Sequence, residues 1–368
     1  MKKVYRILIG LLVLTMAFTA CAPAAVEEPA EVEVVEEPAE AEVVEEEAAE
    51  KFIIGFGVPV LANPFWKANA DFAENMATDL GMDYLIGDAN SQEDQQVKAI
   101  EDLIAQGVDG LILAPVSQAV GPKLLELAEE AGVLVVFAER NPGFKPDEYD
   151  GDIYVGFVGV DNKAGGRLGA EALAEAGVTK ALAIAGAQGN SVVEARVEGF
   201  KEVAAEKGIE VLQIEYGQEL REDGLKTMEN FLAAFPAGEF DGVWCFNDDT
   251  ALGVIEALRQ ADALEGVSVT GLDATEPGVA AIMAGEMLAA PGGQFIDGGL
   301  AAIMLFDALN GNMPKTAWVE MDFLNVVASN AEEYSAQYIE GLPPYDAKEF
   351  SATFNSDAST DDYSIIVN

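Results

Sequence analysis

The stretch KFIIGFGVPVLANPFWKANADFAENMATDLG, residues 51–81, contains the signals of a strand and of a helix in one short piece of chain. Its first ten residues are apolar and rich in β-branched side chains, which is typical of a strand buried on both faces. From Lys67 onward, apolar residues recur three and four positions apart, which predicts an amphipathic helix. NPFW, residues 63–66, therefore lies in a strand-to-helix turn, and its two aromatic rings need an explanation.

The same alternation of strand-like and helix-like segments continues to about residue 294. Continuous apolar strands separated by amphipathic helices indicate parallel sheets that helices cover on both faces. The sequence therefore predicts an α/β fold. The expected strands are 51–59, 82–88, 110–115, 133–139, 154–160, 181–187, 211–216, 242–247, 267–273 and 288–294, and the expected helices include 67–81, 96–107, 119–132, 162–177, 191–208 and 248–261.

Capping residues mark several of the expected helix ends. Ser91, followed by Asp94, has the spacing of a capping box at a helix start. Glycine is the commonest residue just past a helix, where the backbone turns left-handed. We expect helices to end at Gly81, Gly107, Gly132, Gly177 and Gly208.

The first 21 residues have the layout of an export signal. Basic residues precede a short apolar run, and small residues lead to Cys21. This run is shorter than the roughly 20 residues that span a bilayer, so a cleaved signal is favoured over a retained transmembrane anchor. FTAC, residues 18–21, resembles the lipobox of bacterial lipoproteins, although the flanking alanines also fit an ordinary signal-peptidase site. We expect export with a lipid on Cys21, either at the outer face of the cell membrane or in the periplasm.

Residues 22–50 consist almost wholly of Ala, Val, Pro and Glu, without a Lys or Arg. Like charges at this density repel one another and no aromatic side chain is available to bury, so we expect a disordered, acidic tether. If Cys21 carries a lipid, the remaining cysteine is Cys245 in the apolar run GVWCFN, where a buried free thiol is expected. The sequence predicts no disulfide framework.

The chain of 368 residues has a formal net charge of −45, from 65 acidic and 20 basic residues. Nucleic-acid binding needs clustered cations that displace phosphate counterions, and this sequence has no such cluster. We therefore exclude DNA and RNA as partners. The part that follows residue 50 is long enough for two domains, and hydrophobic residues make up 50% of the chain, enough for a large core.

Polar and aromatic residues follow nearly every expected strand. Because ligands bind beyond the carboxyl ends of parallel strands, we expect these side chains to meet at one edge. Taken singly, most have a simpler explanation, such as a helix N-cap or a turn. Capping does not, however, require an arginine beside a glutamate, or two adjacent rings. The residues are Asn63, Phe65 and Trp66; Asp88 and Asn90; Pro115 and Ser117; Glu139 and Arg140; Gln188 and Asn190; Asn247 and Asp248; Asp273; and Gln294.

Such a set of side chains suits a small ligand with many hydroxyl groups. Carboxylates and amide oxygens accept hydrogen bonds from hydroxyls, while arginine and amide nitrogens donate to them. An aromatic face packs against the C–H face of a sugar ring without competing for its hydrogen bonds. We therefore expect Phe65 and Trp66 to form a platform for the ligand and Asn63 to bind a hydroxyl beside it.

From about residue 51 to near its C-terminus, the chain resembles the periplasmic sugar-binding proteins of the ribose and galactose type (type 1 periplasmic binding proteins), which deliver ligands to ABC importers. The similar stretches are GVPVLANPFW, VDGLILAP, VLVVFAER, FVGVDNKAGGRLGAEAL, NSVVEARVEGF, CFNDDTALGVIEAL and VTGLDATEPG. The resemblance implies two doubly wound parallel-sheet lobes joined by three hinge crossings, with the ligand enclosed between them. It places the crossings near 160–161, 294–295 and 322–326, so the first lobe comprises 51–160 plus 295–324 and the second 161–294 plus 325–368.

The resemblance also implies which residues contact the ligand: Asn63, Phe65, Trp66, Glu139, Arg140, Arg196, Asn247, Asp273 and Gln294. The chain departs from the family pattern at several positions. Ribose-binding members usually have an aspartate in place of Glu139 and a ligand-binding asparagine in place of Ala114, and an aromatic residue of their pocket aligns with Glu219. Together with Asp88 at the same edge, Ala114 and Glu219 are possible specificity positions. We therefore expect a monosaccharide other than ribose, or a polyol.

The resulting interpretation is a substrate-binding lipoprotein of an ABC sugar importer. We expect a monomer that closes over its ligand by hinge motion and passes the ligand to a membrane permease. No metal or cofactor is expected, because DEYDGD (147–152) lacks EF-hand spacing and Gly55-Phe56-Gly57 is an incomplete dinucleotide motif. A ligand-sensing module for a chemoreceptor or sensor kinase remains an alternative. A carboxylate-dependent glycosidase is a further alternative, although the sequence contains no histidine, the commonest general base.

Overall fold

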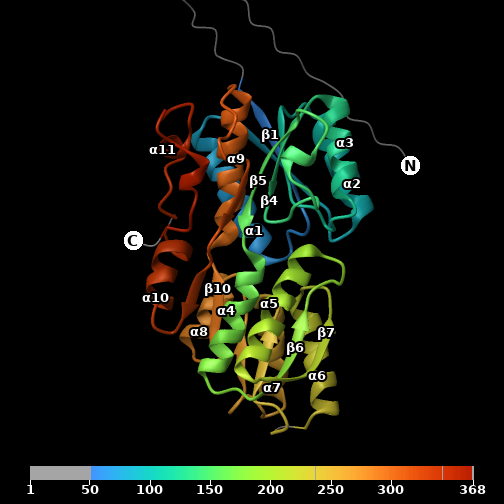
Figure 1. Ribbon diagram of the computed structural model, residues 1–368, viewed down its shortest axis with the longest axis vertical. Helices are drawn as coiled ribbons and strands as arrows, with labels where there is room; N and C mark the ends of the chain where they lie inside the picture. The colour runs from blue at the N-terminus through green and yellow to red at the C-terminus, as the bar shows by residue number, and fades with distance from the viewer. Residues whose placement is uncertain (1–50, 237, 342, 367–368) are drawn as a thin grey trace, which may run out of the picture. The chain divides into compact units, whose positions relative to one another are not determined.

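The computed structural model describes residues 51–236, 238–341 and 343–366, so the expected signal peptide, Cys21 and the acidic tether lie outside the described residues. The described chain forms two six-stranded sheets (Figure 1), with strand orders β11-β5-β4-β3-β1-β2 and β12-β10-β9-β8-β6-β7. Neighbouring strands are parallel except β10 and β12, which are antiparallel. The strands are β1 (Ile53–Val58), β2 (Asp83–Asp88), β3 (Gly110–Leu113), β4 (Leu134–Ala138), β5 (Tyr154–Val160), β6 (Lys180–Ala185), β7 (Glu210–Tyr216), β8 (Gly242–Cys245), β9 (Ser268–Thr270), β10 (Ala289–Gly292), β11 (Trp318–Met321) and β12 (Leu324–Val327).

Helices cover both faces of each sheet. On the first sheet, α1 and α9 pack side by side on one face, and α2 and α3 cover the other (Figure 1). On the second sheet, α4 and α5 lie on one face, and α6, α7 and α8 lie on the other. The helices are α1 (Pro64–Asp79), α2 (Glu93–Ala105), α3 (Gly121–Ala131), α4 (Asn162–Glu175), α5 (Ser191–Lys207), α6 (Arg221–Ala234), α7 (Asp248–Gln260), α8 (Glu276–Met283), α9 (Asp297–Leu309), α10 (Ala331–Tyr334) and α11 (Ala347–Phe350), with a π-helical turn at Ser335–Ile339 and 3₁₀ turns at Pro146–Glu148, Gln294–Ile296 and Thr360–Asp362.

The central strands of each sheet divide their side chains between two apolar layers. In β3, Leu111 and Leu113 pack with α2 and α3, whereas Ile112 faces the layer of α1 and α9. In β8, Trp244 packs with α4 and α5, and Cys245 faces the opposite layer. Because successive side chains of a strand point to opposite faces, a strand covered on both sides must be apolar throughout. The prediction of an α/β fold with doubly covered parallel sheets is confirmed.

The chain passes between the two sheets three times. It leaves the first sheet after β5, which ends at Val160, and returns to it after β10, which ends at Gly292. It then joins β11 of the first sheet to β12 of the second between Met321 and Leu324. These places agree with the three predicted crossings. We call each sheet with its helices a lobe, the first lobe containing β1 and the second containing β6.

The C-terminal segment returns to the first lobe after β12. Tyr345 packs edge-to-face against Phe72 of α1, with ring centroids 5.7 Å apart. Asp307 of α9 accepts hydrogen bonds from the Ser351 hydroxyl at 2.5 Å and from the backbone N–H of Thr353 at 3.0 Å. The sequence predicts the second lobe for all of 325–368, whereas these contacts join residues 345–353 to the first lobe. We therefore propose that this segment belongs to the first lobe.

Two features of the local structure differ from the predictions. Strands β11 and β12 were not predicted. The capping box at Ser91 is wrong, since the N-cap of α2 is Gln92 and its side chain makes no capping hydrogen bond. The predicted helix ends at Gly132 and Gly208 are confirmed, because both glycines are left-handed C-caps.

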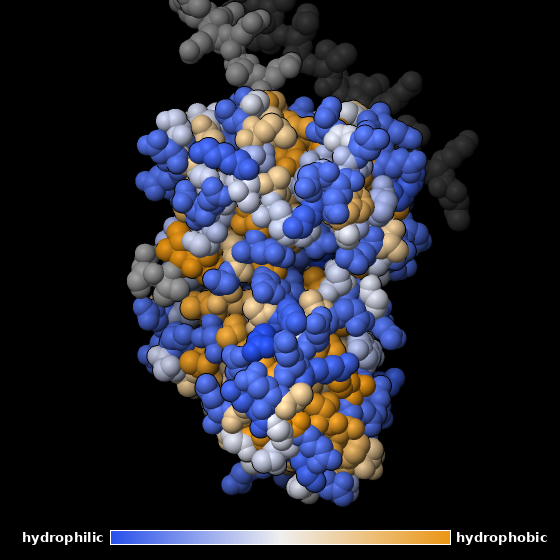
Figure 2. Space-filling model, in the orientation of Figure 1, coloured by the Kyte–Doolittle hydropathy of each residue, from blue (hydrophilic) through white to orange (hydrophobic). Residues whose placement is uncertain are grey.

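Polar side chains cover most of the molecular face in Figure 2, in keeping with the acidic composition. Among the helices that the structure describes, none combines the length and the apolar character needed to span a membrane. Cys245 is fully buried and free, as predicted, and burial raises the pKa of its thiol.

Candidate functional site

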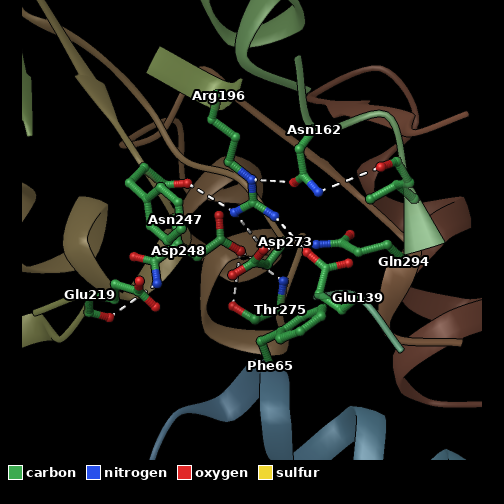
Figure 3. A network of polar contacts seen from close by, with 12 residues as sticks. Phe65, Glu139, Asn162, Arg196, Glu219, Asn247, Asp248, Asp273, Thr275 and Gln294 are labelled. Carbon is green, nitrogen blue, oxygen red and sulfur yellow. Dashed lines mark hydrogen bonds and ion pairs between the residues drawn. The ribbon is translucent and has the colours of Figure 1, made fainter. Parts of the chain in front are cut away.

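Side chains from both lobes line one pocket between the two sheets. They follow β1 and β4 in the first lobe and β7, β8 and β9 in the second, or lie on α5, so the carboxyl ends of several parallel strands meet there. Part of this network is shown in Figure 3. The lining residues are Asn63, Phe65, Trp66, Glu139, Arg140, Val192, Arg196, Glu219, Phe246, Asn247 and Asp273.

Asn63 and Asn247 each have two roles at this pocket. The Oδ1 atom of Asn63 accepts a hydrogen bond from the backbone N–H of Phe65 at 2.9 Å, and that of Asn247 accepts one from Thr250 at 2.9 Å. These bonds cap α1 and α7. Both Nδ2 groups donate to the carbonyl oxygen of Glu219, at 3.5 Å from Asn63 and 3.0 Å from Asn247. Capping therefore fixes each amide so that its NH₂ group points into the pocket.

Arg196 connects three sides of the pocket (Figure 3). Its side chain is 3% exposed and donates from Nε to Oδ1 of Asn162 at 2.7 Å and from Nη2 to Oε1 of Glu139 at 3.0 Å. Nη1 donates to the carbonyl oxygen of Phe246 at 3.3 Å and lies 3.6 Å from Oδ1 of Asp273. Glu139 belongs to the first lobe and Asp273 to the second. One buried cation therefore pairs with a carboxylate from each lobe.

Close helix packing sets the position of Arg196. A Cβ atom on Gly166 of α4 would lie 1.9 Å from the carbonyl oxygen of Arg196 on α5. On the facing helix, a Cβ atom on Gly199 would lie 2.1 Å from the carbonyl oxygen of Lys163. Only glycine permits the two backbones to approach this closely, and the approach carries the Arg196 side chain to the pocket.

Glu139 and Asp297 form a buried acidic pair behind Arg196. Asp297, the first residue of α9, is fully buried, and its Oδ1 accepts a hydrogen bond from Nδ2 of Asn69 at 2.5 Å. Oε2 of Glu139 and Oδ2 of Asp297 are both buried without a hydrogen-bond partner among the described residues. Burial raises the pKa of Glu139 against the attraction of Arg196, and burial and the Glu139 charge hold the pKa of Asp297 well above its ordinary value.

Arg140 closes another side of the pocket. Its Nη2 donates to Oε2 of Glu219 at 2.8 Å, and the two side chains are only 8% and 12% exposed. Its guanidinium carbon lies 5.1 Å from the ring centre of Trp66, within the range of a cation–π contact. Trp66 packs edge-to-face against Phe65, with ring centroids 5.0 Å apart. In this arrangement Arg140 therefore covers the aromatic platform that the sequence predicts for a sugar.

Two further buried acids lie on the second-lobe side. Oδ1 of Asp273 accepts a hydrogen bond from Nε2 of Gln294 at 2.8 Å, and burial raises the pKa of Asp273 well above its usual range. Asp248 lies behind the pocket, where its Oδ2 accepts from the backbone N–H of Thr275 at 2.7 Å and from the Thr275 hydroxyl at 2.9 Å. Burial raises the pKa of Asp248 to about 7.

The structure brings most of the predicted site residues together. Of the nine residues implied as ligand contacts, eight line the pocket, and Gln294 is fully buried behind Asp273. Of the three possible specificity positions, Glu219 lines the pocket and the others do not. Asp88 accepts hydrogen bonds from the backbone of Leu61 and Asn90, and the carbonyl oxygen of Ala114 accepts from Gln96. Both therefore bond within the first lobe, because the chain beyond β2 and β3 folds back on its own lobe.

Sequence reasoning missed several residues of the site. Val192 and Phe246 line the pocket, and Asn162 and Asp297 hold the charged groups behind it. Phe246 directly precedes Asn247 at the end of a strand, so its position in the sequence could have predicted that it lines the pocket. Asp297 had no such signal, because it follows a crossing and is brought to Glu139 only by the packing of α9.

The pocket is nearly filled by its own side chains. Its cavity volume is about 20 Å³, which is room for about one water molecule. Within the described ranges, no three acidic or cysteine side chains are grouped so as to hold a metal ion. The arrangement offers carboxylates, guanidiniums, amides and aromatic rings, which together can bind a polyhydroxylated molecule once the lobes separate.

Comparison with known proteins identifies relatives over the same region. A family model described as periplasmic binding protein domain matches residues 54–313. The ribose import binding protein of Bacillus subtilis is 31% identical over 235 residues, which cover 63% of this chain and 73% of that protein.

Solved structures agree with this match. A solute binding protein of an ABC transporter from Bacillus halodurans, with bound myo-inositol, is 26% identical, with a TM-score of 0.69 over 78% of this chain and 98% of that one. A periplasmic solute binding protein of an ABC transporter from Actinobacillus succinogenes, with bound D-allose, is 25% identical, with a TM-score of 0.71 over 77% of this chain and 100% of that one.

Proposed function

Because the chain belongs to the periplasmic binding protein domain family, we propose that it is the substrate-binding lipoprotein of an ABC sugar importer. The relatives are periplasmic sugar-binding proteins of such importers, which implies export. The proposed ligand is a monosaccharide or a polyol, captured between the lobes and delivered to a membrane permease. The observation that supports this most directly is the convergence of eight implied contact residues from both lobes on one pocket.

Ligand entry requires the lobes to separate. Arg140 bonds to Glu219 and Arg196 to Glu139 across the pocket, and the remaining cavity is about 20 Å³. A monosaccharide is much larger than a water molecule, so it must part these contacts and then replace them. Its hydroxyls donate to the carboxylates and accept from the guanidiniums, so the charged groups of both lobes regain partners only when the lobes close on the ligand. This difference in contacts favours the closed form when ligand is bound.

We further propose that the pocket binds its ligand without cleaving it. The relatives are binding proteins. A glycosidase places an acid and a second carboxylate on either side of the scissile bond. In this pocket, Glu139 and Asp273 face the same guanidinium of Arg196. Both carboxylates are therefore engaged with Arg196, and they do not flank an open space that could hold a scissile bond.

The parts outside the described residues complete the proposal. Cys21 would carry the lipid anchor, and residues 22–50 would act as an acidic tether between the membrane and the folded lobes. The length of such a tether allows the lobes to reach the permease. The protein would act as a monomer, since one chain supplies both halves of the pocket.

A carbohydrate screen tests the proposal. The purified protein is heated with single pentoses, hexoses and polyols, while its melting temperature and its tryptophan fluorescence, to which Trp66 contributes, are followed. We expect at least one of these compounds to raise the melting temperature, because a ligand that binds only the folded state stabilises it. Arg140→Ala should remove the response, whereas Lys98→Ala on an exposed helix face should keep it. A full panel without any response contradicts the proposal, and hydrolysis of aryl glycosides would favour an enzyme.

A further inference from the structure

Glu219 enters the pocket in an unusual backbone conformation. It lies between β7 and α6 with a φ of 69°, a left-handed value that is uncommon for residues other than glycine. A Cβ atom on Gly186, at the end of β6, would lie 2.8 Å from Cγ and 2.9 Å from Oε1 of Glu219. The glycine therefore leaves the space that the glutamate side chain occupies. Strained residues of this kind are retained at functional sites.

The backbone of Glu219 is also held from both lobes. Asn63 of the first lobe and Asn247 of the second both donate to its carbonyl oxygen, at 3.5 Å and 3.0 Å. A side chain that is 12% exposed and fixed by these contacts has little freedom to turn to solvent. Its carboxylate is therefore a fixed part of the pocket wall.

Carboxyl groups outnumber guanidinium groups among the side chains that line the pocket. Three carboxylates, Glu139, Glu219 and Asp273, face two guanidiniums, Arg140 and Arg196, and no lysine is among the lining residues. Arg196 lies within ion-pair distance of both Glu139 and Asp273. Glu219 has Arg140 as its single ion-pair partner among the described residues.

A ligand between the lobes would separate Arg140 from Glu219, because their side chains meet across the pocket. Arg140 would keep the face of Trp66 and the neighbouring charge of Glu139. Glu219 would keep no cation. A hydroxyl can donate one hydrogen bond to this carboxylate, but a ligand that supplies a positive charge there stabilises the closed, liganded form more, because a buried carboxylate without a cation is disfavoured.

We propose that the ligand carries a protonated amine beside its hydroxyls, as an amino sugar or amino polyol does, and that Glu219 binds the ammonium group. This inference rests on the proposed function and narrows the class of ligand. The ammonium would also lie near the face of Trp66, which attracts cations. Glu219 is then the residue that distinguishes an amine from a hydroxyl at one ring position.

Titration calorimetry with matched ligands tests this inference. D-glucosamine, D-galactosamine and D-mannosamine are each compared with the parent hexose and with the N-acetyl derivative, which keeps the nitrogen at the same ring position as an uncharged, larger acetamide. We expect at least one amine to bind at least ten-fold more tightly than both counterparts. The ten-fold difference corresponds to about 1.4 kcal/mol.

Variants of Glu219 assign the effect to this residue. Glu219→Gln should reduce the affinity for the amine to that for the parent hexose, and Glu219→Asp, which keeps the charge, should restore part of the preference. Glu222→Gln, at an exposed position on α6, should change nothing. Circular dichroism and the melting temperature of each variant check that it is folded.

The possible results separate this inference from the proposed function. Binding of neutral sugars without a preference for amines overturns the amine inference alone, as does a preference that persists in Glu219→Gln. Absence of binding by every sugar, amino sugar and polyol overturns the proposed function and the inference with it.

Discussion

The Nη2 atom of Arg140 lies 2.8 Å from Oε2 of Glu219, so an arginine that follows β4 of the first lobe is bonded to a glutamate that follows β7 of the second. Both side chains are mostly buried, which makes this contact more costly to break than a surface ion pair. The same pair that a ligand must separate therefore also holds the lobes together when no ligand is bound.

The first prediction concerns closure without ligand. Arg140→Met and Glu219→Gln each leave one charged group of the pair without its partner. In the closed form that group is buried, at a cost of about 3–5 kcal/mol, so each variant should favour the open form. Small-angle X-ray scattering should show a larger radius of gyration for each single variant than for the parent protein. Lys98→Met breaks an exposed pair within α2 and should leave the radius unchanged. Equal radii in all four proteins would contradict a role of this pair in closure.

The second prediction concerns Arg196. Arg196→Met leaves Glu139 and Asp273 without their cation and should lower the free energy of unfolding by about 3–5 kcal/mol. Urea denaturation measures this change. The control is Arg259→Met, whose side chain is 48% exposed, and its loss should cost at most about 1 kcal/mol. Similar losses in the two variants would mean that Arg196 is not an internal counter-charge.

The third prediction concerns the contact between α4 and α5. Gly166→Ala would place a methyl group 1.9 Å from the carbonyl oxygen of Arg196 and must push the two helices apart. We expect a loss of about 1–3 kcal/mol in stability and a weaker response to ligand. Gly217→Ala is the matched control, because its nearest neighbour would lie at 3.6 Å, an ordinary contact. Thermal melts with and without ligand compare the two variants. Equal melting temperatures and equal shifts on adding ligand would refute the role of Gly166.

The fourth prediction concerns Asp248 and pH. Burial raises the pKa of this carboxyl from 3.8 to about 7, so the folded protein binds a proton more tightly than the unfolded chain does. The associated stability is present in full below about pH 4 and is lost as the pH rises through about 7, a change on the order of 4 kcal/mol. Glu139, Asp273 and Asp297 act in the same direction, since burial raises their pKa values too.

Asp248→Asn keeps an acceptor for Thr275 but removes the titrating group. The melting temperature of the variant should therefore fall less than that of the parent protein between pH 5 and pH 8. Glu265→Gln, at an exposed position, should leave the profile unchanged. A variant profile parallel to that of the parent protein would exclude Asp248 as a source of the pH dependence.

The sequence by itself determined the fold class and most of the pocket. Strands that are covered on both faces are apolar rather than alternating. Ten of the twelve described strands could therefore be predicted from the sequence. The residues after these strands converge because parallel strands place their carboxyl ends at one edge. For this reason Asn63, Arg140 and Asn247 could be assigned to a site without any coordinates, and all three line the pocket.

Only the tertiary structure decided which of these side chains meet, and at what distance. Asp88 is the last residue of β2 and Glu139 directly follows β4, yet Asp88 bonds to the loop of its own lobe while Glu139 faces Arg196. Asp297 reaches Glu139 because α9 packs against β4, a contact between residues far apart in sequence. Periodicity and capping act over a few neighbouring residues, whereas contacts across the pocket depend on how two separately packed sheets close on each other. The charge balance of the pocket is set by those contacts, and no local pattern in the chain encodes it.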